Sequence, residues 1–290
     1  MRWSLPSWPA GFPLLLATMF GVFGPSEAVA RAVTIVVAGL LAPLTGYLAF
    51  RLSGRRAVGL VAGGLAVLHP LAVAFSGQIF TNNISVTLFV ASLCLMLSAT
   101  MRSDASGVVP FGQLLASSRR RAYLAGAAFL FGAMLSVRDT AAMLVGPSLY
   151  LLYRTGAFRW RSAIAEGRAF GRMFATAVVA FFFGWGPGLY FNAVNFGSLF
   201  MSAHYETDIR LSVDYLLHGS EALFGLPGIA VMALTVAVFQ FPVLLIAPTL
   251  VVGPARERLA AIMASLIVLP LLLVNGAFPV ASSGAAPRYV

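Results

Sequence analysis

Residues 33–56 read VTIVVAGLLAPLTGYLAFRLSGRR, and this stretch decides the class of the protein. Its first part, 33–50, carries no charged side chain, and Arg51, Arg55 and Arg56 follow directly. A membrane-crossing helix needs about 20 mostly apolar residues, and arginines gather in the cytoplasmic connections of such helices. The stretch therefore predicts a transmembrane helix whose C-terminal end lies in the cytoplasm.

The composition of the whole chain supports the same class. Of its 290 residues, 60% are hydrophobic and 10% are charged, whereas about a quarter of the residues of a soluble domain are charged. This composition excludes a water-soluble globular protein. We therefore predict an all-α fold, a polytopic transmembrane helical bundle with about eight spans.

One assignment among these spans has an alternative. Residues 122–153 could form a single helix of about 48 Å, but a hydrocarbon core is only about 30 Å thick. A single helix would also reverse the direction in which every later span crosses the membrane. Two short crossings with a break at Arg138 and Asp139 are therefore preferred. The predicted spans are 33–50, 57–77, 84–101, 122–137, 140–153, 172–192, 228–251 and 259–277.

The net charge of +10 at pH 7 could suggest a nucleic-acid partner, but the placement of the charges argues against one. The arginines concentrate in alternate connections between the spans, as expected for cytoplasmic loops. We therefore predict contact with membrane lipids and no contact with nucleic acid. The arginine-rich connections contain Arg51, Arg55, Arg56, Arg102, Arg119, Arg120, Arg121, Arg154, Arg159, Arg161, Arg168, Arg172, Arg256 and Arg258.

The chain is predicted to form a single transmembrane domain, 1–290, with its spans within 33–277. Residues 1–31 could hold a signal peptide, but the prolines and tryptophans near the start favour an extracytoplasmic helix in the membrane interface. The longest extracytoplasmic loop is predicted at 193–227. Loops of this length are often functional.

Two places carry candidate functional side chains. Arg138 and Asp139 are charges at a predicted break within the membrane, where charge marks function by default. They could cap the turn as an ion pair, or the guanidinium could bind an anionic headgroup. The long loop adds further polar groups, namely His204, Tyr205 and Glu206.

The sequence predicts no cofactor. It contains no phosphate-binding loop, dinucleotide fingerprint or nucleophile elbow. His69, His204 and His218 lack the spacing of zinc ligands, so no metal site is predicted. The sequence leaves open whether the protein binds a divalent cation.

Several loose motifs together resemble the membrane glycosyltransferases of the GT-C type, whose relatives include protein O-mannosyltransferases and aminoarabinose transferases. Val137–Thr140 is similar to an Arg-Pro-Thr turn of that family, and His69-Pro70 with Thr81-Asn82 is similar to its third-to-fourth helix connection. The remaining similar segments are 8–17, 23–26, 30–31, 187–205 and 287–289.

The resemblance implies a multi-pass enzyme of the bacterial inner membrane. Such an enzyme transfers a sugar from a polyprenyl-phosphate donor to a lipid, glycan or protein acceptor on the extracytoplasmic face. It implies that Arg138 and Arg288 hold the donor phosphate. The implied sugar and acceptor pocket contains Asn82, Asp139, His204, Tyr205 and Glu206.

Two features depart from the family pattern. The family's catalytic Asp would lie upstream of Met1, which suggests a chain truncated at both ends. Asn82 and Asn83 stand where relatives carry an acid, and an amide cannot serve as a general base. The alternatives are a transporter or flippase of a lipid-linked or anionic solute, and a non-catalytic scaffold.

Overall fold

The computed structural model describes residues 9–68, 81–102, 107–138, 142, 144–157, 167–200, 258–259 and 262–263. The backbone divides into two compact units, Met1–Ala203 and His204–Val290. Of the second unit only Arg258, Leu259, Ile262 and Met263 are described, and all of them are helical. The account below concerns the first unit.

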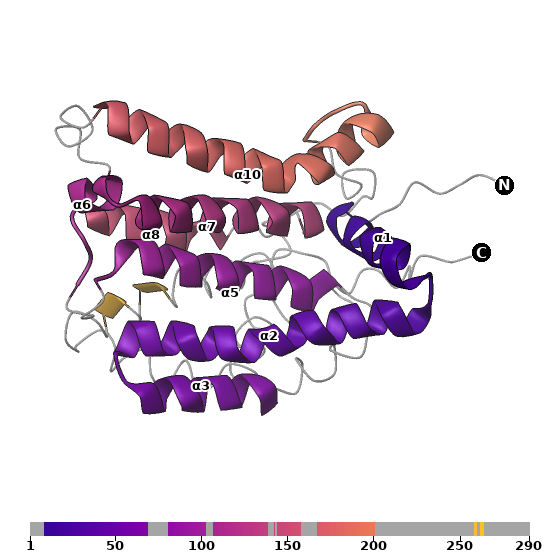
Figure 1. Ribbon diagram of the computed structural model, residues 1–290, viewed down its shortest axis with the longest axis horizontal. Helices are drawn as coiled ribbons and strands as arrows, with labels where there is room; N and C mark the ends of the chain where they lie inside the picture. The colour runs from indigo at the N-terminus through magenta and orange to yellow at the C-terminus, as the bar shows by residue number, and fades with distance from the viewer. Residues whose placement is uncertain are drawn as a thin grey trace, which may run out of the picture. The chain divides into compact units, whose positions relative to one another are not determined.

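The described part of the chain is helical and contains no strand beyond an isolated bridge between Met101 and Val108. The predicted all-α class is therefore correct for the described residues. The helices of the first unit are shown in Figure 1: α1 (Gly11–Phe23), α2 (Glu27–Ser53), α3 (Arg56–Leu68), α5 (Thr81–Thr100), α6 (Phe111–Ala116), α7 (Ser118–Val137), α8 (Gly146–Thr155) and α10 (Gly167–Phe196).

Helix α5 lies at the centre of this unit and contacts α2, α7 and α8. In its most apolar window, Asn83–Thr100, 72% of the residues are buried. Its contacts with α2 show that the two helices are parallel. Thr87 Oγ1 donates to the carbonyl oxygen of Val37 at 3.1 Å, and the hydroxyls of Ser98 and Tyr47 are 2.9 Å apart.

Helix α7 packs against the opposite side of α5 and runs antiparallel to it. Ser92 Oγ donates to the carbonyl oxygen of Ala127 at 2.8 Å, while Arg120 Nη1 donates to that of Ala99 at 2.6 Å. The side-chain hydroxyl of Ser92 is therefore satisfied inside the interface, as an apolar environment requires.

Helix α10 runs parallel to α7, and the two backbones approach closely (Figure 1). A Cβ atom added to Gly132 would overlap the carbonyl oxygen of Phe181, and one added to Gly184 would overlap that of Phe129. Small residues allow this approach between helices in a membrane, where packing rather than water drives association. Because both helices run in the same direction, the chain between Arg138 and Gly167 must return from one end of the unit to the other.

Helices α2 and α3 form an antiparallel hairpin that also depends on glycine. The connection turns at Gly54, which has a left-handed φ of 73°. A Cβ at Gly46 would lie 2.9 Å from the carbonyl oxygen of Gly59, and one at Gly63 would lie 3.1 Å from that of Ala42. Larger side chains at these glycines would separate the two helices.

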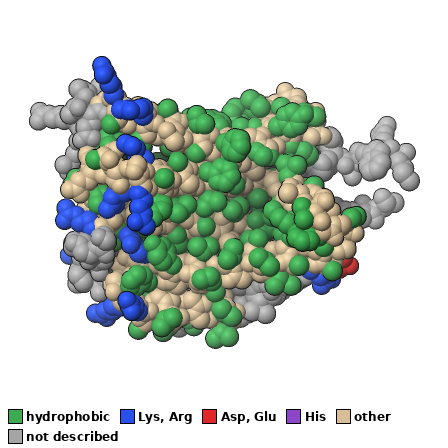
Figure 2. Space-filling view, in the orientation of Figure 1, with side chains coloured by type: hydrophobic (Ala, Val, Ile, Leu, Met, Phe, Trp, Pro, Cys, Tyr) green, Lys and Arg blue, Asp and Glu red, His purple; other side chains and the backbone are tan. Residues whose placement is uncertain are grey.

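Most of the basic side chains visible in Figure 2 gather at one end of the helices, on the left. We call this the arginine end. It combines the C-terminal ends of α2, α5 and α8 with the N-terminal ends of α3, α7 and α10. This sorting agrees with the predicted cytoplasmic connections. Its described arginines are Arg51, Arg55, Arg56, Arg102, Arg119, Arg120, Arg121, Arg154, Arg168 and Arg172.

The opposite end, which we call the α1 end, comprises α1, the first turns of α2 and α5 and the last turn of α7. Phe12 of α1 packs with Ile84 of α5 and Val137 of α7 in one buried cluster. Helix α1 has 13 residues, too few to cross a bilayer. A helix within 1–31 was predicted, and its place in the extracytoplasmic membrane interface stays a prediction; the structure adds that it packs on the other helices through Phe12.

Among the described residues, three helices are long and apolar enough to cross a membrane, namely Glu27–Ser53, Asn83–Thr100 and Gly167–Asn195. They coincide with three of the predicted spans, and the number eight stays a prediction. The first span begins at Glu27, not at residue 33, because Ser26 caps α2 by accepting a hydrogen bond from the Val29 N–H at 3.2 Å. Helix α7 ends at Val137 and α8, a helix of ten residues, begins at Gly146, so 122–153 is not one continuous helix; the two short membrane crossings stay a prediction.

Candidate functional site at the α1 end

Arg138 lies directly after the last residue of α7. Its backbone is extended, with φ −155° and ψ 107°, and its N–H donates to the carbonyl oxygen of Met134 at 2.8 Å. Val137, the preceding residue, is buried, whereas Arg138 itself is exposed. Burial of Val137 therefore anchors the helix end from which the guanidinium side chain projects.

The first turn of α5 lies beside this helix end. Ile84 of α5 is 2% exposed and belongs to the same cluster as Val137. The N–H groups in the first turn of a helix have no partner within the helix, and they carry the positive end of the helix dipole. Asn82 and Asn83 are in this turn, and Asn83 is buried. A helix N-terminus and a guanidinium both favour anions, so this end is suited to a phosphate.

The floor of the site is apolar. Leu15 and Leu16 of α1 pack against the cluster of Phe12, Ile84 and Val137, as do Val37 of α2 and Leu88 of α5. Four helices thus meet beneath Arg138. Close approach of α1 depends on Gly11, because a Cβ there would lie 2.6 Å from the backbone of Ser136.

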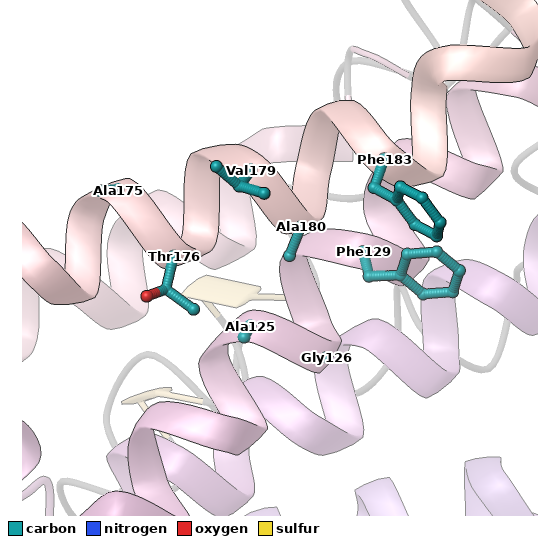
Figure 3. Close-up of a pocket in the computed structure, with 8 residues that line it drawn as sticks. All are labelled: Ala125, Gly126, Phe129, Ala175, Thr176, Val179, Ala180 and Phe183. Carbon is teal, nitrogen blue, oxygen red and sulfur yellow. The ribbon is translucent and has the colours of Figure 1, made fainter.

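An apolar groove runs between α7 and α10, on the side drawn in Figure 3. Its volume is about 740 Å³, and the aromatic rings of Phe129 and Phe183 flank it with centroids 6.2 Å apart. Thr176 provides a hydroxyl, which already donates to the carbonyl oxygen of Arg172 at 2.8 Å. The groove therefore suits a hydrocarbon chain better than a polar solute. The other lining residues are Ala125, Gly126, Ala175, Val179 and Ala180.

The groove and Arg138 are related through α7. Phe129 precedes Arg138 by nine residues, which corresponds to about 13 Å along a helix axis. Val179 and Phe183 are exposed on the α10 side, so the groove opens laterally. A lipid with its phosphate at Arg138 could lay its chain along α7 toward this groove.

The structure brings together part of the predicted site. Arg138 and the backbone of Asn82 lie at the same end, on neighbouring helix termini. Asp139, His204, Tyr205, Glu206 and Arg288 lie outside the described residues, as does the side chain of Asn82. Their predicted roles stay predictions.

Sequence reasoning did not find the α7–α10 groove. The available signal was the spacing of small residues, with Ala125 and Gly126 on one helix and Ala175 and Ala180 on the other. Such spacing indicates close helix packing in membranes, but it does not say which side of the contact is left open.

The described residues contain no group of three His, Cys, Asp or Glu side chains that could hold a metal ion.

Arg31 and Glu27, which are one turn apart on α2, form an ion pair with a distance of 2.6 Å between Nη2 and Oε1. It belongs to the same α1 end as Arg138 and provides a natural reference for tests of that residue.

No protein-family model, curated protein or solved structure matches the chain.

Proposed function

We propose that this protein is a membrane glycosyltransferase that takes a sugar from a polyprenyl-phosphate donor on the extracytoplasmic face. The observation that carries the proposal is the buried cluster that Val137 shares with Ile84 and Phe12, because Arg138 follows Val137 directly and Ile84 lies in the first turn of α5. The resemblance to GT-C enzymes supports the reaction class. The helical fold and the three apolar helices support residence in a membrane.

In the proposed reaction the acceptor hydroxyl attacks the anomeric carbon of the donor sugar. The bond from that carbon to the phosphate oxygen breaks, and the lipid phosphate leaves with the electron pair. Arg138 would stabilise the charge on the leaving phosphate, together with the N–H groups of α5. A carboxylate would accept the proton of the hydroxyl. In the family that the chain resembles, this carboxylate belongs to the first extracytoplasmic loop.

The α7–α10 groove would hold part of the polyprenyl chain. Its lining is apolar apart from the satisfied hydroxyl of Thr176, so the contact adds affinity without selecting the sugar. Specificity for the sugar and for the acceptor would then come from the extracytoplasmic loops. Asp139, His204, Tyr205 and Glu206 are the proposed pocket residues, and Arg288 is a second proposed phosphate ligand.

The test is transfer of radiolabelled sugar from a polyprenyl-phosphate donor by membranes that contain the protein. We expect Arg138→Ala to lower transfer by at least about tenfold, as for loss of a charged hydrogen bond. Arg31→Ala is the matched control at the same end, because Arg31 is paired with Glu27. Equal transfer by the Arg138→Ala and wild-type proteins would remove the role of Arg138.

The same assay distinguishes sugar transfer from the rival function, which is transport. A transporter or flippase would move the labelled lipid across the membrane without forming a new covalent product. Label recovered only as unchanged donor, on the opposite side of sealed vesicles, would therefore favour transport over transfer.

A further inference from the structure

The groove between α2 and α3 is lined by an arginine at one end and by mainly apolar residues along the rest. Its volume is about 510 Å³, and Arg56 lines it together with Phe50, Leu60, Gly64 and Val67. Tyr47 also lines it, but the hydroxyl of Tyr47 is 2.9 Å from that of Ser98 on α5. Apart from Arg56, the groove therefore presents almost no polar group to a ligand.

The length of the groove matches one leaflet. Its lining residues on α3 extend from Arg56 to Val67, which is about 16 Å along a helix axis. This is about half of a hydrocarbon core of about 30 Å. In a bilayer crossed by α2, a groove that starts at Arg56 would begin at the membrane surface on the side of the arginine end and end near the middle of the bilayer.

Positive charge is concentrated at the mouth of the groove. Arg55 and Arg56 are exposed next to the turn at Gly54, and Arg51 is on the preceding turn of α2. Among the described residues of the arginine end there is no carboxylate to neutralise them. A ligand with a phosphate and a hydrocarbon chain would satisfy both parts of the groove.

We propose that the α2–α3 groove binds an anionic phospholipid of the leaflet at the arginine end, with its phosphate at Arg55 and Arg56 and one acyl chain along α3. A second copy of the protein is a poorer occupant. Two copies with the same orientation in the membrane would bring these arginines close to one another, and like charges repel. This site is separate from the proposed donor site, which is at the α1 end.

Gly64 lines the groove and has open space where a side chain would lie. A Cβ at Gly64 would meet no atom within 4 Å, whereas one at Gly46, Gly59 or Gly63 would press on the backbone of the facing helix. Gly64→Leu therefore fills the groove and leaves the helix contact intact. Gly39→Leu is the matched control, because Gly39 on α2 is equally open and does not line the groove.

The experiment measures phospholipid binding to the purified full chain in detergent by native mass spectrometry. The probes are dioleoylphosphatidylglycerol and dioleoylphosphatidylcholine. We expect the wild type to retain phosphatidylglycerol preferentially. Arg56→Gln should weaken this binding about fivefold, the equivalent of about 1 kcal/mol per basic residue near a membrane surface. Gly64→Leu should lower the retention of phosphatidylglycerol, and Gly39→Leu should leave it unchanged.

Arg119→Gln is the control for charge, since Arg119 is at the same end but donates to the hydroxyl of Tyr123 on its own helix. Equal losses in Arg56→Gln and Arg119→Gln would mean diffuse attraction, and the proposal would fail. It would also fail if Gly64→Leu and Gly39→Leu bound phosphatidylglycerol equally well. A dimer in detergent that Gly64→Leu abolishes would assign the groove to a second copy and would likewise overturn the proposal.

Discussion

The hydroxyl of Ser136 on α7 donates a hydrogen bond of 2.9 Å to the carbonyl oxygen of Gly184 on α10. Ser136 is 3% exposed, so this bond lies inside the interface between the two parallel helices. A Cβ added to Gly188 would lie 3.2 Å from the same hydroxyl. The bond and the two glycines fix the distance between α7 and α10 within one turn of Arg138.

We expect Gly184→Ala to destabilise the protein by about 2 kcal/mol, as overpacking in a close-packed interface does. Its Cβ would overlap the carbonyl oxygen of Phe129. Gly186→Ala on the same helix is the control, since a Cβ there meets nothing within 4 Å. The measurement is thermal unfolding in detergent, followed by circular dichroism. Similar stabilities of the two variants would contradict the helix contact.

Arg120 caps the C-terminal end of α5 and should be the most important structural arginine described at the arginine end. Its Nη1 donates to the carbonyl oxygens of Ala99 at 2.6 Å and Met101 at 3.1 Å. Removing hydrogen bonds from a charged donor costs about 2 kcal/mol, so Arg120→Ala should lower the unfolding free energy by this amount. Arg119→Ala should change it by less than about 0.5 kcal/mol, because surface substitutions are usually mild. Equal losses would show that Arg120 has no special role.

The orientation of the helices can be tested with introduced thiols. Ala28 and Gln113 are exposed at the α1 end and the arginine end respectively. In intact cells a membrane-impermeant maleimide should label Ala28→Cys, and it should label Gln113→Cys only after permeabilisation. The native Cys94 is buried and should stay unlabelled, so no cysteine-free background is needed. The opposite labelling pattern would invert the predicted topology.

Helix α1 should contribute to binding at the candidate site. Gly11→Ala would push α1 away from the backbone of Ser136 and Val137, next to Arg138. We expect the variant to bind polyprenyl phosphate less tightly than the wild type. Gly21→Ala is the control, since Gly21 faces open space on the same helix. Equal binding of polyprenyl phosphate by both variants would show that α1 does not contribute to the site.

The sequence predicted the helical class and the segregation of arginines because both follow from composition and from alternation along the chain. It also predicted the break after Val137, where the Arg138–Asp139 pair interrupts an apolar run. It did not predict that α7 and α10 are adjacent and parallel, because that contact joins residues about 50 positions apart, such as Ser136 and Gly184. Hydropathy identifies apolar segments but carries no information on which of them pack together.

The candidate site, too, was predicted only in part from the sequence. Arg138 was predicted as a charge in an apolar context, and Asn82 from the family resemblance. Their location at one end of the helices depends on Ile84 and Val137 packing together with Phe12. None of these three apolar residues differs in type from many others in the chain, so the sequence offered no reason to select them.

The shared direction of α7 and α10 has a consequence for biosynthesis. Helix α7 is synthesised well before α10, because the ribosome must first synthesise the whole stretch from Arg138 to Gly167. During this interval the Ser136 hydroxyl and the bare backbone at Gly132 have no α10 to cover them. An arrested nascent chain that stops before Gly167 should therefore be a preferred substrate for membrane quality-control proteases, and one that extends beyond Phe196 should survive.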